Sequence, residues 1–223
     1  MEGDPVKKHD QKGTFSDRES AERFARLSER VFAPVNTAIA RQIVAECGIT
    51  RGTAIEIGSG PAHLAIEVAR ITDLRVIALD ISVPMRSIAA RTIHDAGLYD
   101  QITPLSGDAA AIPLSDASTD LVFSKGSAFF WPDPAGAFRE IRRVLGPGGQ
   151  AWIGGGFGSA EILERVREQM DRIDTAWIEG VHERLSDRTA ERFRADLDRA
   201  GIEDYTILRE PWHLWIRFSR GEG

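Results

Sequence analysis

A short apolar run that leads through a glycine turn into a helical pattern constrains this chain more than any other feature. Residues 54–60 read Ala-Ile-Glu-Ile-Gly-Ser-Gly, and Leu64, Val68 and Ile71 then recur at the spacing of one helix face. A buried parallel strand that enters a helix through such a turn presents backbone N–H groups to a nucleoside ligand in α/β sheets. Glycine is needed there because a Cβ would block both the tight turn and the approach of the ligand.

A second apolar run extends this pattern. It occupies residues 75–80 and ends in Asp80, which lies 20 residues beyond Gly60. A carboxylate at the tip of the second strand can accept both hydroxyls of a ribose, and this spacing is expected of a βαβ nucleoside site. Either piece alone is equally consistent with an ordinary strand and loop, but the ordered pair predicts a nucleoside-binding site.

The residues around the turn favour one nucleoside over another. A dinucleotide site reads G-x-G-x-x-G, and here His63 takes the place of the third glycine. Glu56 lies two residues before Gly58, where a carboxylate would repel a pyrophosphate but suit a cationic ligand. S-adenosylmethionine (SAM) carries a sulfonium and an ammonium and has no phosphate, so it fits better than NAD.

With Glu56, Gly58, Gly60 and Asp80 in this order, the chain resembles the class I SAM-dependent methyltransferases (type 11/25-like) over roughly residues 35–155. The resemblance implies an α/β fold, a Rossmann-like doubly wound sheet of seven strands. Their order would be 3-2-1-4-5-7-6, with the last strand antiparallel and helices on both faces. It also implies SAM as cofactor, S-adenosylhomocysteine as product and no metal.

One residue departs from the family pattern. Ala62 stands where such enzymes often have a third glycine. Alanine is the smallest replacement, so we expect a slightly altered loop and a retained site.

The composition limits the class of protein and its partners. The 223 residues and 42% hydrophobic content suit one domain with a full core. A net charge of −6 argues against a nucleic-acid partner. The single cysteine, Cys47, fits a reducing compartment and is most simply a small apolar helix residue. With no apolar run of signal-peptide or membrane type, we expect a cytoplasmic protein that does not act at a membrane. We also expect a monomer or homodimer that acts on a small-molecule acceptor.

The domain organisation follows from the apolar periodicity. We expect a flexible N-terminus and one SAM-binding domain, in which two helices separated near Pro34 precede the cofactor-binding core. The expected boundaries are 1–14 for the flexible segment, 15–223 for the domain, and within it 15–48 for the cap helices, 49–156 for the core and 157–223 for C-terminal helices and a β-hairpin.

The candidate cofactor-binding residues lie after successive strands. Ile81 and Met85 follow the acidic tip, where the adenine ring needs apolar cover. Residues 102–106 read as a third strand with Pro104 at a sheet edge, and the resemblance assigns Asp108 to the adenine amino group beside the backbone of Ala109. The full set is Glu56, Gly58, Ser59, Gly60, His63, Asp80, Ile81, Met85, Gly107, Asp108, Ala109, Ser124 and Lys125.

An aromatic segment follows the predicted fourth strand, residues 121–125. Residues 129–131 read Phe-Phe-Trp at the expected mouth of the site. They are equally consistent with a hydrophobic plug beneath the next helix and with an apolar wall of the acceptor pocket. The candidate pocket residues are Phe32, Phe129, Phe130, Trp131 and Phe157.

The second half of the chain has clear helix and strand signals. Residues 133–145 and 150–154 predict a helix and the fifth strand, with a glycine-rich stop between them. The run 154–158 predicts a mobile turn beside the pocket. Ser159 is expected to start one long helix that ends at Gly180, and its expected inward residues are Ile162, Val166, Met170, Ile173 and Trp177. A helix from Ser186 to Gly201 and two strands around Glu210-Pro211 complete the chain.

The catalytic residues are the least constrained part. Methyl transfer from a sulfonium requires mainly positioning, and a base only where the acceptor loses a proton. The candidate bases are His63, His94, Lys125 and His182, of which His63 and Lys125 are nearest the expected site. No His, Cys or carboxylate cluster has metal-ligand spacing. Three classes stay open: a small-molecule methyltransferase, a SAM-binding protein without turnover, and an NAD-dependent oxidoreductase.

Overall fold

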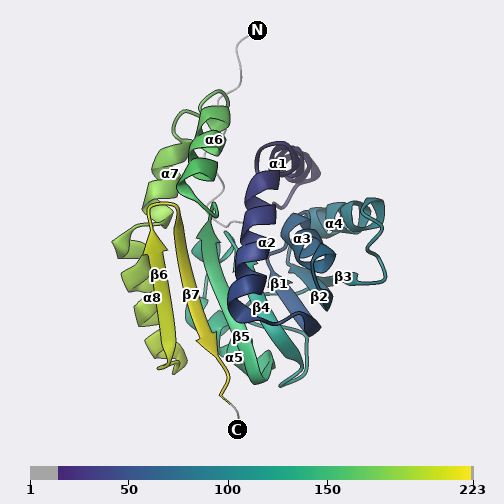
Figure 1. The fold of residues 1–223 in the computed structure, drawn as a ribbon, viewed down its shortest axis with the longest axis vertical. Coiled ribbons are helices and arrows are strands. Elements are labelled where there is room, and N and C mark those ends of the chain that lie inside the picture. The colour runs from purple at the N-terminus through teal and green to yellow at the C-terminus, as the bar shows by residue number, and fades with distance from the viewer. Residues whose placement is uncertain (1–14, 222–223) are drawn as a thin grey trace.

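The computed structural model describes residues 15–221, which form a seven-stranded sheet with helices on both faces (Figure 1). The strand order is β3-β2-β1-β4-β5-β7-β6; β7 is antiparallel to both of its neighbours and the other pairings are parallel. This confirms the predicted sheet. The expected flexible segment 1–14 lies outside the described residues. The strands are β1 (Arg51–Ile57), β2 (Asp73–Asp80), β3 (Ile102–Ser106), β4 (Thr119–Lys125), β5 (Leu145–Gly156), β6 (Tyr205–Glu210) and β7 (His213–Ser219).

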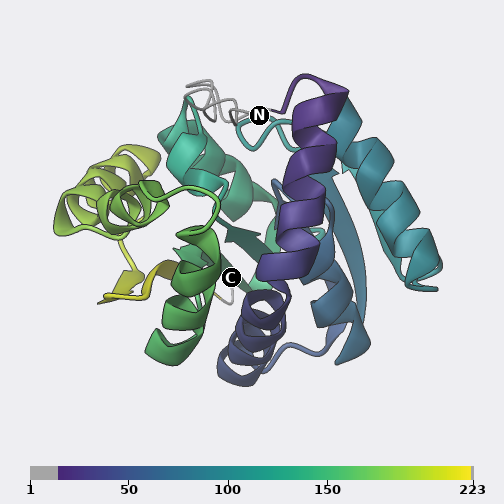
Figure 2. The same ribbon diagram turned by 90° about the horizontal axis from the view of Figure 1, so that it is seen from above.

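The helices pack in two groups. In the view of Figure 1, α2 and α3 pack against each other in front of the sheet, and α5 packs with α8 behind it. Figure 2, the view from above, shows α1 and α6 nearest the viewer with the sheet beneath them. The helices are α1 (Arg18–Val31), α2 (Ala33–Cys47), α3 (His63–Arg70), α4 (Val83–Asp95), α5 (Pro134–Val144), α6 (Ala160–Met170), α7 (Trp177–Arg184) and α8 (Asp187–Ala200), with a 3-10 turn η1 (Ala128–Phe130).

Local sequence signals set several helix starts. Ser82 caps α4 by accepting a hydrogen bond from the Met85 amide, and Asp133 caps α5 in the same way from Gly136. Pro34 lies in the first turn of α2, where its missing N–H has no cost. Among residues 15–221, no helix combines the length and the apolar character needed to cross a membrane.

The prediction of one long helix from Ser159 to Gly180 is wrong. The chain forms α6 and α7 with turns between them, and Gly180 lies inside α7. The Asp174 side chain accepts a hydrogen bond from the Ala176 amide, an Asx turn that competes with helix. Ile173, expected to face inward, is 42% exposed. Apolar spacing alone did not reveal the break, because Trp177 opens the new helix at a position that continues the old period.

The mobile turn predicted at 154–158 is also corrected. Gly154, Gly155 and Gly156 belong to β5, where they pair with Trp215, Leu214 and His213 of β7. The strand is longer than the expected 150–154 at both ends, because β5 also includes 145–149, where the sequence predicted a glycine-rich stop. Gly154, Gly155 and Gly156 allow close approach of the antiparallel strand, and at Gly156 a Cβ would lie only 2.4 Å from the Cβ of His213.

Candidate functional site

The glycine turn and the acidic tip of the second strand are joined by hydrogen bonds. The Gly60 amide donates to Oδ2 of Asp80 at 2.8 Å, and the Ser82 amide donates to Oδ1 at 2.8 Å. The two amides before Gly60 in the turn both donate to the Leu79 carbonyl. Burial raises the pKa of the Asp80 carboxyl, although the amides of Ser82 and Gly60 oppose the shift by favouring its charged form. The carboxylate is thus oriented by the backbone, and each oxygen keeps a further lone pair.

Gly58 packs against the loop that follows β4. Its φ is +69°, and a Cβ at this position would lie 2.3 Å from the Cβ of Ser127. The Ser127 hydroxyl donates to the Ile57 carbonyl at 2.9 Å and shares a 2.7 Å hydrogen bond with the hydroxyl of Ser124. Ser124 is fully buried, so its hydroxyl supports the loop. Only glycine fits this position without moving the chain.

Glu56 lies beneath the turn with its carboxylate buried. Its Oε2 accepts a hydrogen bond from the Ala65 amide in the first turn of α3 at 2.9 Å. A negative charge there is favoured by the helix dipole. Burial nevertheless raises the pKa of Glu56 well above its ordinary value, and the nearby charge of Lys125 opposes that shift.

Lys125, at the end of β4, places its ammonium in the same region. Its Nζ donates to the side-chain oxygen of Asn36 and lies 6.0 Å from the centre of the Phe32 ring. Burial lowers the pKa of Lys125, and the carboxylate of Glu56 opposes this. No carboxylate among residues 15–221 forms an ion pair with it, so the ammonium is held by a neutral amide.

His63 begins α3 and is linked to α1. Its Nδ1 lies 3.0 Å from the hydroxyl of Ser28, a buried residue of that helix. Burial, together with the charge of Lys125, lowers the pKa of His63, which favours the neutral imidazole at pH 7. If Nδ1 carries the proton and donates to Ser28, Nε2 has a free lone pair and can accept a proton.

These groups enclose one small cavity of about 60 Å³ between α1, α2 and the glycine turn. Its wall holds an ammonium, a carboxylate, an imidazole and the backbone of the turn. Such a set can bind a small zwitterion. The lining residues are Phe24, Ser28, Asn36, Glu56, Gly58, Ser59, Gly60, Pro61, His63, Leu64 and Lys125.

The residues expected near an adenine ring differ in exposure. Ile81 is 52% exposed, whereas Met85 is buried in a separate cluster beneath α1 with Ala21 and Ile88. Asp108 is exposed and opens a tight turn: its Oδ1 accepts from the Ala110 amide at 2.9 Å, and its carbonyl accepts from the Ala111 amide at 3.0 Å. Ala109, within this turn, is buried.

Gly107, which precedes this turn, joins it to Asp80 and to the core. Its amide lies 3.5 Å from the Asp80 carbonyl oxygen. A Cβ at Gly107 would lie 2.7 Å from the Leu79 side chain and 2.8 Å from Cδ of Pro113. The start of the turn is therefore tightly packed.

The expected aromatic pocket divides into two groups. Phe32 and Phe157 both pack on Trp177 of α7, with ring centres 6.2 and 5.7 Å away. In the segment after β4, Phe129 packs against Phe193, and Trp131 packs edge-on against Phe138 of α5. The exposed ring of the segment is that of Phe130, with 45% of its surface accessible. The contacts of Phe129 and Trp131 are those of a hydrophobic plug.

Ser28, Asn36 and Trp177 were not predicted from the sequence as site residues, and neither were Phe24, Pro61 and Leu64 of the cavity wall. Signals existed for the two polar residues. Ser28 occupies the apolar stripe of α1 between Phe24 and Val31, and Asn36 shares the buried stripe of α2. A polar residue on a buried helix face requires a partner. Trp177 had been assigned to the interior of a continuous helix.

The other candidate bases lie away from this cavity. His94 is exposed on α4, where it stacks on Tyr99, and His182 is exposed on α7. Within the described residues, no group of three His, Cys, Asp or Glu side chains could hold a metal ion.

Comparisons with known proteins show the family to which the chain belongs. Residues 55–153 match the family model described as "Methyltransferase domain". A solved structure from Methanococcus maripaludis, assigned to the S-adenosyl-L-methionine-dependent methyltransferases, is 39% identical with a TM-score of 0.91 and 99% of each chain covered.

Two curated relatives are similar over shorter stretches. Methyltransferase GfsG of Streptomyces halstedii is 29% identical over 67% of this chain and 52% of its own length. Dimethylglycine N-methyltransferase of Parasynechococcus marenigrum is 34% identical over 44% of this chain and 35% of its own. The chain thus spans about half or less of these two relatives.

Proposed function

This chain belongs to the class I SAM-dependent methyltransferases, and on that premise we propose that it transfers the SAM methyl group to a small-molecule acceptor. The observation that carries the proposal is the pair of hydrogen bonds by which Gly60 and Ser82 orient the Asp80 carboxylate. This pair supports the proposal, because a nucleoside site of this kind requires an oriented carboxylate at the end of the second strand.

In the proposed complex, Asp80 accepts the ribose hydroxyls through the lone pairs that the backbone amides leave free. Ile81 covers one face of the adenine ring, and Asp108 accepts from the adenine amino group beside the Ala109 backbone. Met85 supports this region from beneath. The exposure of Ile81 and Asp108 supports these roles, because both can be reached by a ligand.

The methionine end of SAM is proposed to enter the cavity beside the glycine turn. The residues fit it, because the wall carries both a carboxylate, Glu56, and an ammonium, Lys125, as an amino acid zwitterion requires. The Lys125 ammonium binds the ligand carboxylate while the Asn36 amide keeps it in place. The ligand's ammonium across the turn would favour the ionised form of Glu56 against the effect of burial, and the resulting carboxylate would attract that ammonium.

The acceptor is proposed to bind where Phe32, Phe157 and Trp177 meet, next to Lys125. An aromatic wall with one cation suits a small organic molecule that has an apolar body. One relative's name specifies dimethylglycine, which supports a small-molecule acceptor in general. Phe130, the exposed ring after β4, is a further candidate for this wall.

When bound, SAM supplies an activated methyl group, so the protein has to align the acceptor and exclude water. His63 is the proposed proton acceptor for acceptors that must lose a proton. Its neutral form and its Ser28 contact prepare Nε2 for that role. We further propose that the protein acts in the cytoplasm as a monomer or homodimer, without nucleic acid or membrane.

Calorimetric titration with SAM, S-adenosylhomocysteine and NAD tests the cofactor assignment. We expect micromolar binding of the first two and none of NAD; binding of NAD alone would overturn it. Incubation with methyl-labelled SAM and a panel of small acceptors then tests turnover. Binding without any labelled product across the panel would favour the alternative of a SAM-binding protein without turnover.

A further inference from the structure

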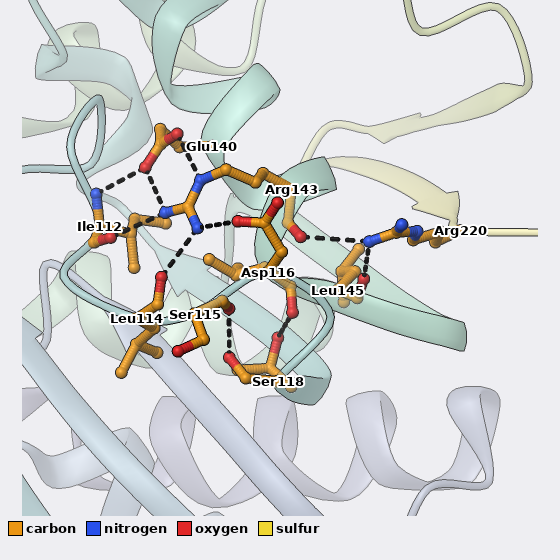
Figure 3. A network of polar contacts seen from close by, with 11 residues as sticks. Ile112, Leu114, Ser115, Asp116, Ser118, Glu140, Arg143, Leu145 and Arg220 are labelled. Atoms are coloured by element: carbon orange, nitrogen blue, oxygen red, sulfur yellow. Dashed lines mark hydrogen bonds and ion pairs between the residues drawn. The ribbon is translucent and has the colours of Figure 1, made fainter.

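The loop that carries the Asp108 turn is held from outside the site by an arginine of α5 (Figure 3). Arg143 has five N–H groups, and each one has an acceptor. Nε and Nη2 donate to the two carboxylate oxygens of Glu140 at 2.8 and 2.7 Å. The other three N–H groups donate to the loop between β3 and β4; their acceptors are the Ile112 carbonyl at 2.8 Å, the Leu114 carbonyl at 2.8 Å and the Asp116 carboxylate at 2.7 Å.

Glu140 adds a bond of its own to the same loop. Its Oε2 accepts from the Ile112 amide at 2.9 Å while it also binds Arg143. Ile112 therefore has both its amide and its carbonyl held by this side-chain pair. The two side chains are 21% and 29% exposed, so solvent screens the pair only partly. The hydrogen bonds from Arg143 lower the pKa of Glu140 and keep it ionised.

The residues held by the pair adjoin the turn directly. Ile112 follows the turn 108–111, whose ends pair as an isolated β-bridge between Asp108 and Ala111. Pro113 lies between the two carbonyls that Arg143 binds, and its ring packs against Gly107 at the start of the turn. The turn is thus fixed at its end by Ile112 and at its start by Pro113.

We propose that Arg143 and Glu140 are positioning residues that hold the turn 108–111 so that Asp108 can read the amino group of the bound nucleoside's base. The inference rests on the proposed function, since it assumes that SAM binds with its adenine at Asp108. It assigns to α5, on the far side of the loop, a role in ligand selectivity. Lysine could not replace Arg143, because it lacks the planar fork that binds two carbonyls and two carboxylates at once.

The test compares two ligands that differ only at the base. S-adenosylhomocysteine presents an amino group, and S-inosylhomocysteine presents a carbonyl oxygen in its place. We expect the wild-type protein to prefer the first, and Arg143→Lys to reduce that preference about tenfold. Glu140→Gln should reduce it in the same direction, because one carboxylate oxygen becomes an NH2 group, which cannot accept from Arg143 or Ile112 and adds a donor that faces them. A general loss of stability would not change this ratio of affinities.

Arg142→Lys is the matched control, since Arg142 lies on the same helix and binds the Gly201 carbonyl instead. It should keep the wild-type preference. Asp108→Ala should lose the preference, and adding Arg143→Lys to it should cause no further loss, because the pair acts through Asp108. Melting temperatures identify any variant that fails to fold. If Arg143→Lys fails to fold, Glu140→Gln tests the proposal in its place.

The outcomes separate the two proposals. Failure of the wild-type protein to bind S-adenosylhomocysteine would contradict the proposed function itself. Wild-type binding with an unchanged preference in both Arg143→Lys and Glu140→Gln would overturn the positioning role alone. The same holds if the losses in Asp108→Ala and Arg143→Lys add. Equal binding of both ligands by the wild-type protein would overturn the proposed contact of Asp108 with the base, and with it the positioning role.

Discussion

The amide of Gly60 donates a 2.8 Å hydrogen bond to the Oδ2 oxygen of Asp80, so the turn after β1 and the tip of β2 are directly connected. The bond spans 20 residues of sequence. It explains why the two motifs act as one site: movement of either segment would misplace the other.

Asp80→Ala should weaken S-adenosylhomocysteine binding by at least about 1 kcal/mol, or about fivefold in Kd, because charge-assisted bonds to the ribose are lost. Titration calorimetry measures this change in Kd. Asp73→Ala is the control on the same strand, at an exposed carboxylate whose one ion pair within residues 15–221 is with the exposed Arg51. Unchanged affinity in folded Asp80→Ala would contradict the ribose assignment.

Lys125→Met should weaken binding of S-adenosylhomocysteine much more than binding of 5′-methylthioadenosine, which lacks the amino acid end. The reason is that Lys125 is expected to bind only the ligand carboxylate. A loss of about tenfold for the first ligand is expected for a hydrogen bond to a charged group. Equal losses for both ligands would show that Lys125 acts on the fold or on the nucleoside instead.

Glu56 should make the protein less stable as pH rises. Its pKa is raised in the folded state from an ordinary 4.5, so in the window above 4.5 the folded protein holds a proton that the unfolded chain has released. Stability is therefore lost with rising pH until the raised pKa is passed. Urea unfolding across this window should show a smaller fall for Glu56→Gln than for the wild-type protein. Parallel pH profiles for the two proteins would contradict the raised pKa.

Gly58→Ala should destabilise the protein more than Gly97→Ala. The two glycines have nearly the same positive φ, +69° and +70°, but a Cβ at Gly58 meets Ser127 whereas nothing lies within 4 Å at Gly97. Gly97→Ala should then cost about 1 kcal/mol for the left-handed backbone alone. Thermal unfolding compares them, and Gly58→Ala with Ser127→Gly should recover part of the difference. Equal costs would mean that the Ser127 contact relaxes freely.

Ala62 illustrates what the sequence could establish at the site. Its departure from the family glycine predicted an altered but intact turn, and Ala62 does take a left-handed conformation, φ 65°, at the start of α3. The position of Asp80 was also predictable, because it depends on a local apolar run and on spacing, whereas the strand order was predictable only through the resemblance to the family. The contacts of Lys125 with Asn36 and of His63 with Ser28 were not, since they join residues 89 and 35 positions apart.

The interruption between α6 and α7 shows a different limit. The apolar residues Val166, Met170 and Trp177 keep a helical period across the break, so the pattern contained no signal for it. At the break the Asp174 side chain accepts from the Ala176 amide, and Trp177 packs against Phe32 and Phe157, which come from distant parts of the chain. Neither the Asx turn nor these tertiary contacts could be inferred from the apolar period alone.

The place of β7 in the sheet has a consequence for how the protein is made. During synthesis β6 emerges from the ribosome before β7. In the sheet, however, β6 pairs with β7, which lies between β6 and β5. Until residues 213–219 have left the exit tunnel, β5 has an open edge and β6 has no partner in the sheet. The nascent chain thus passes through a stage in which the motif segments are already present while one sheet edge is free to bind other strands, a stage at which chaperones would matter most.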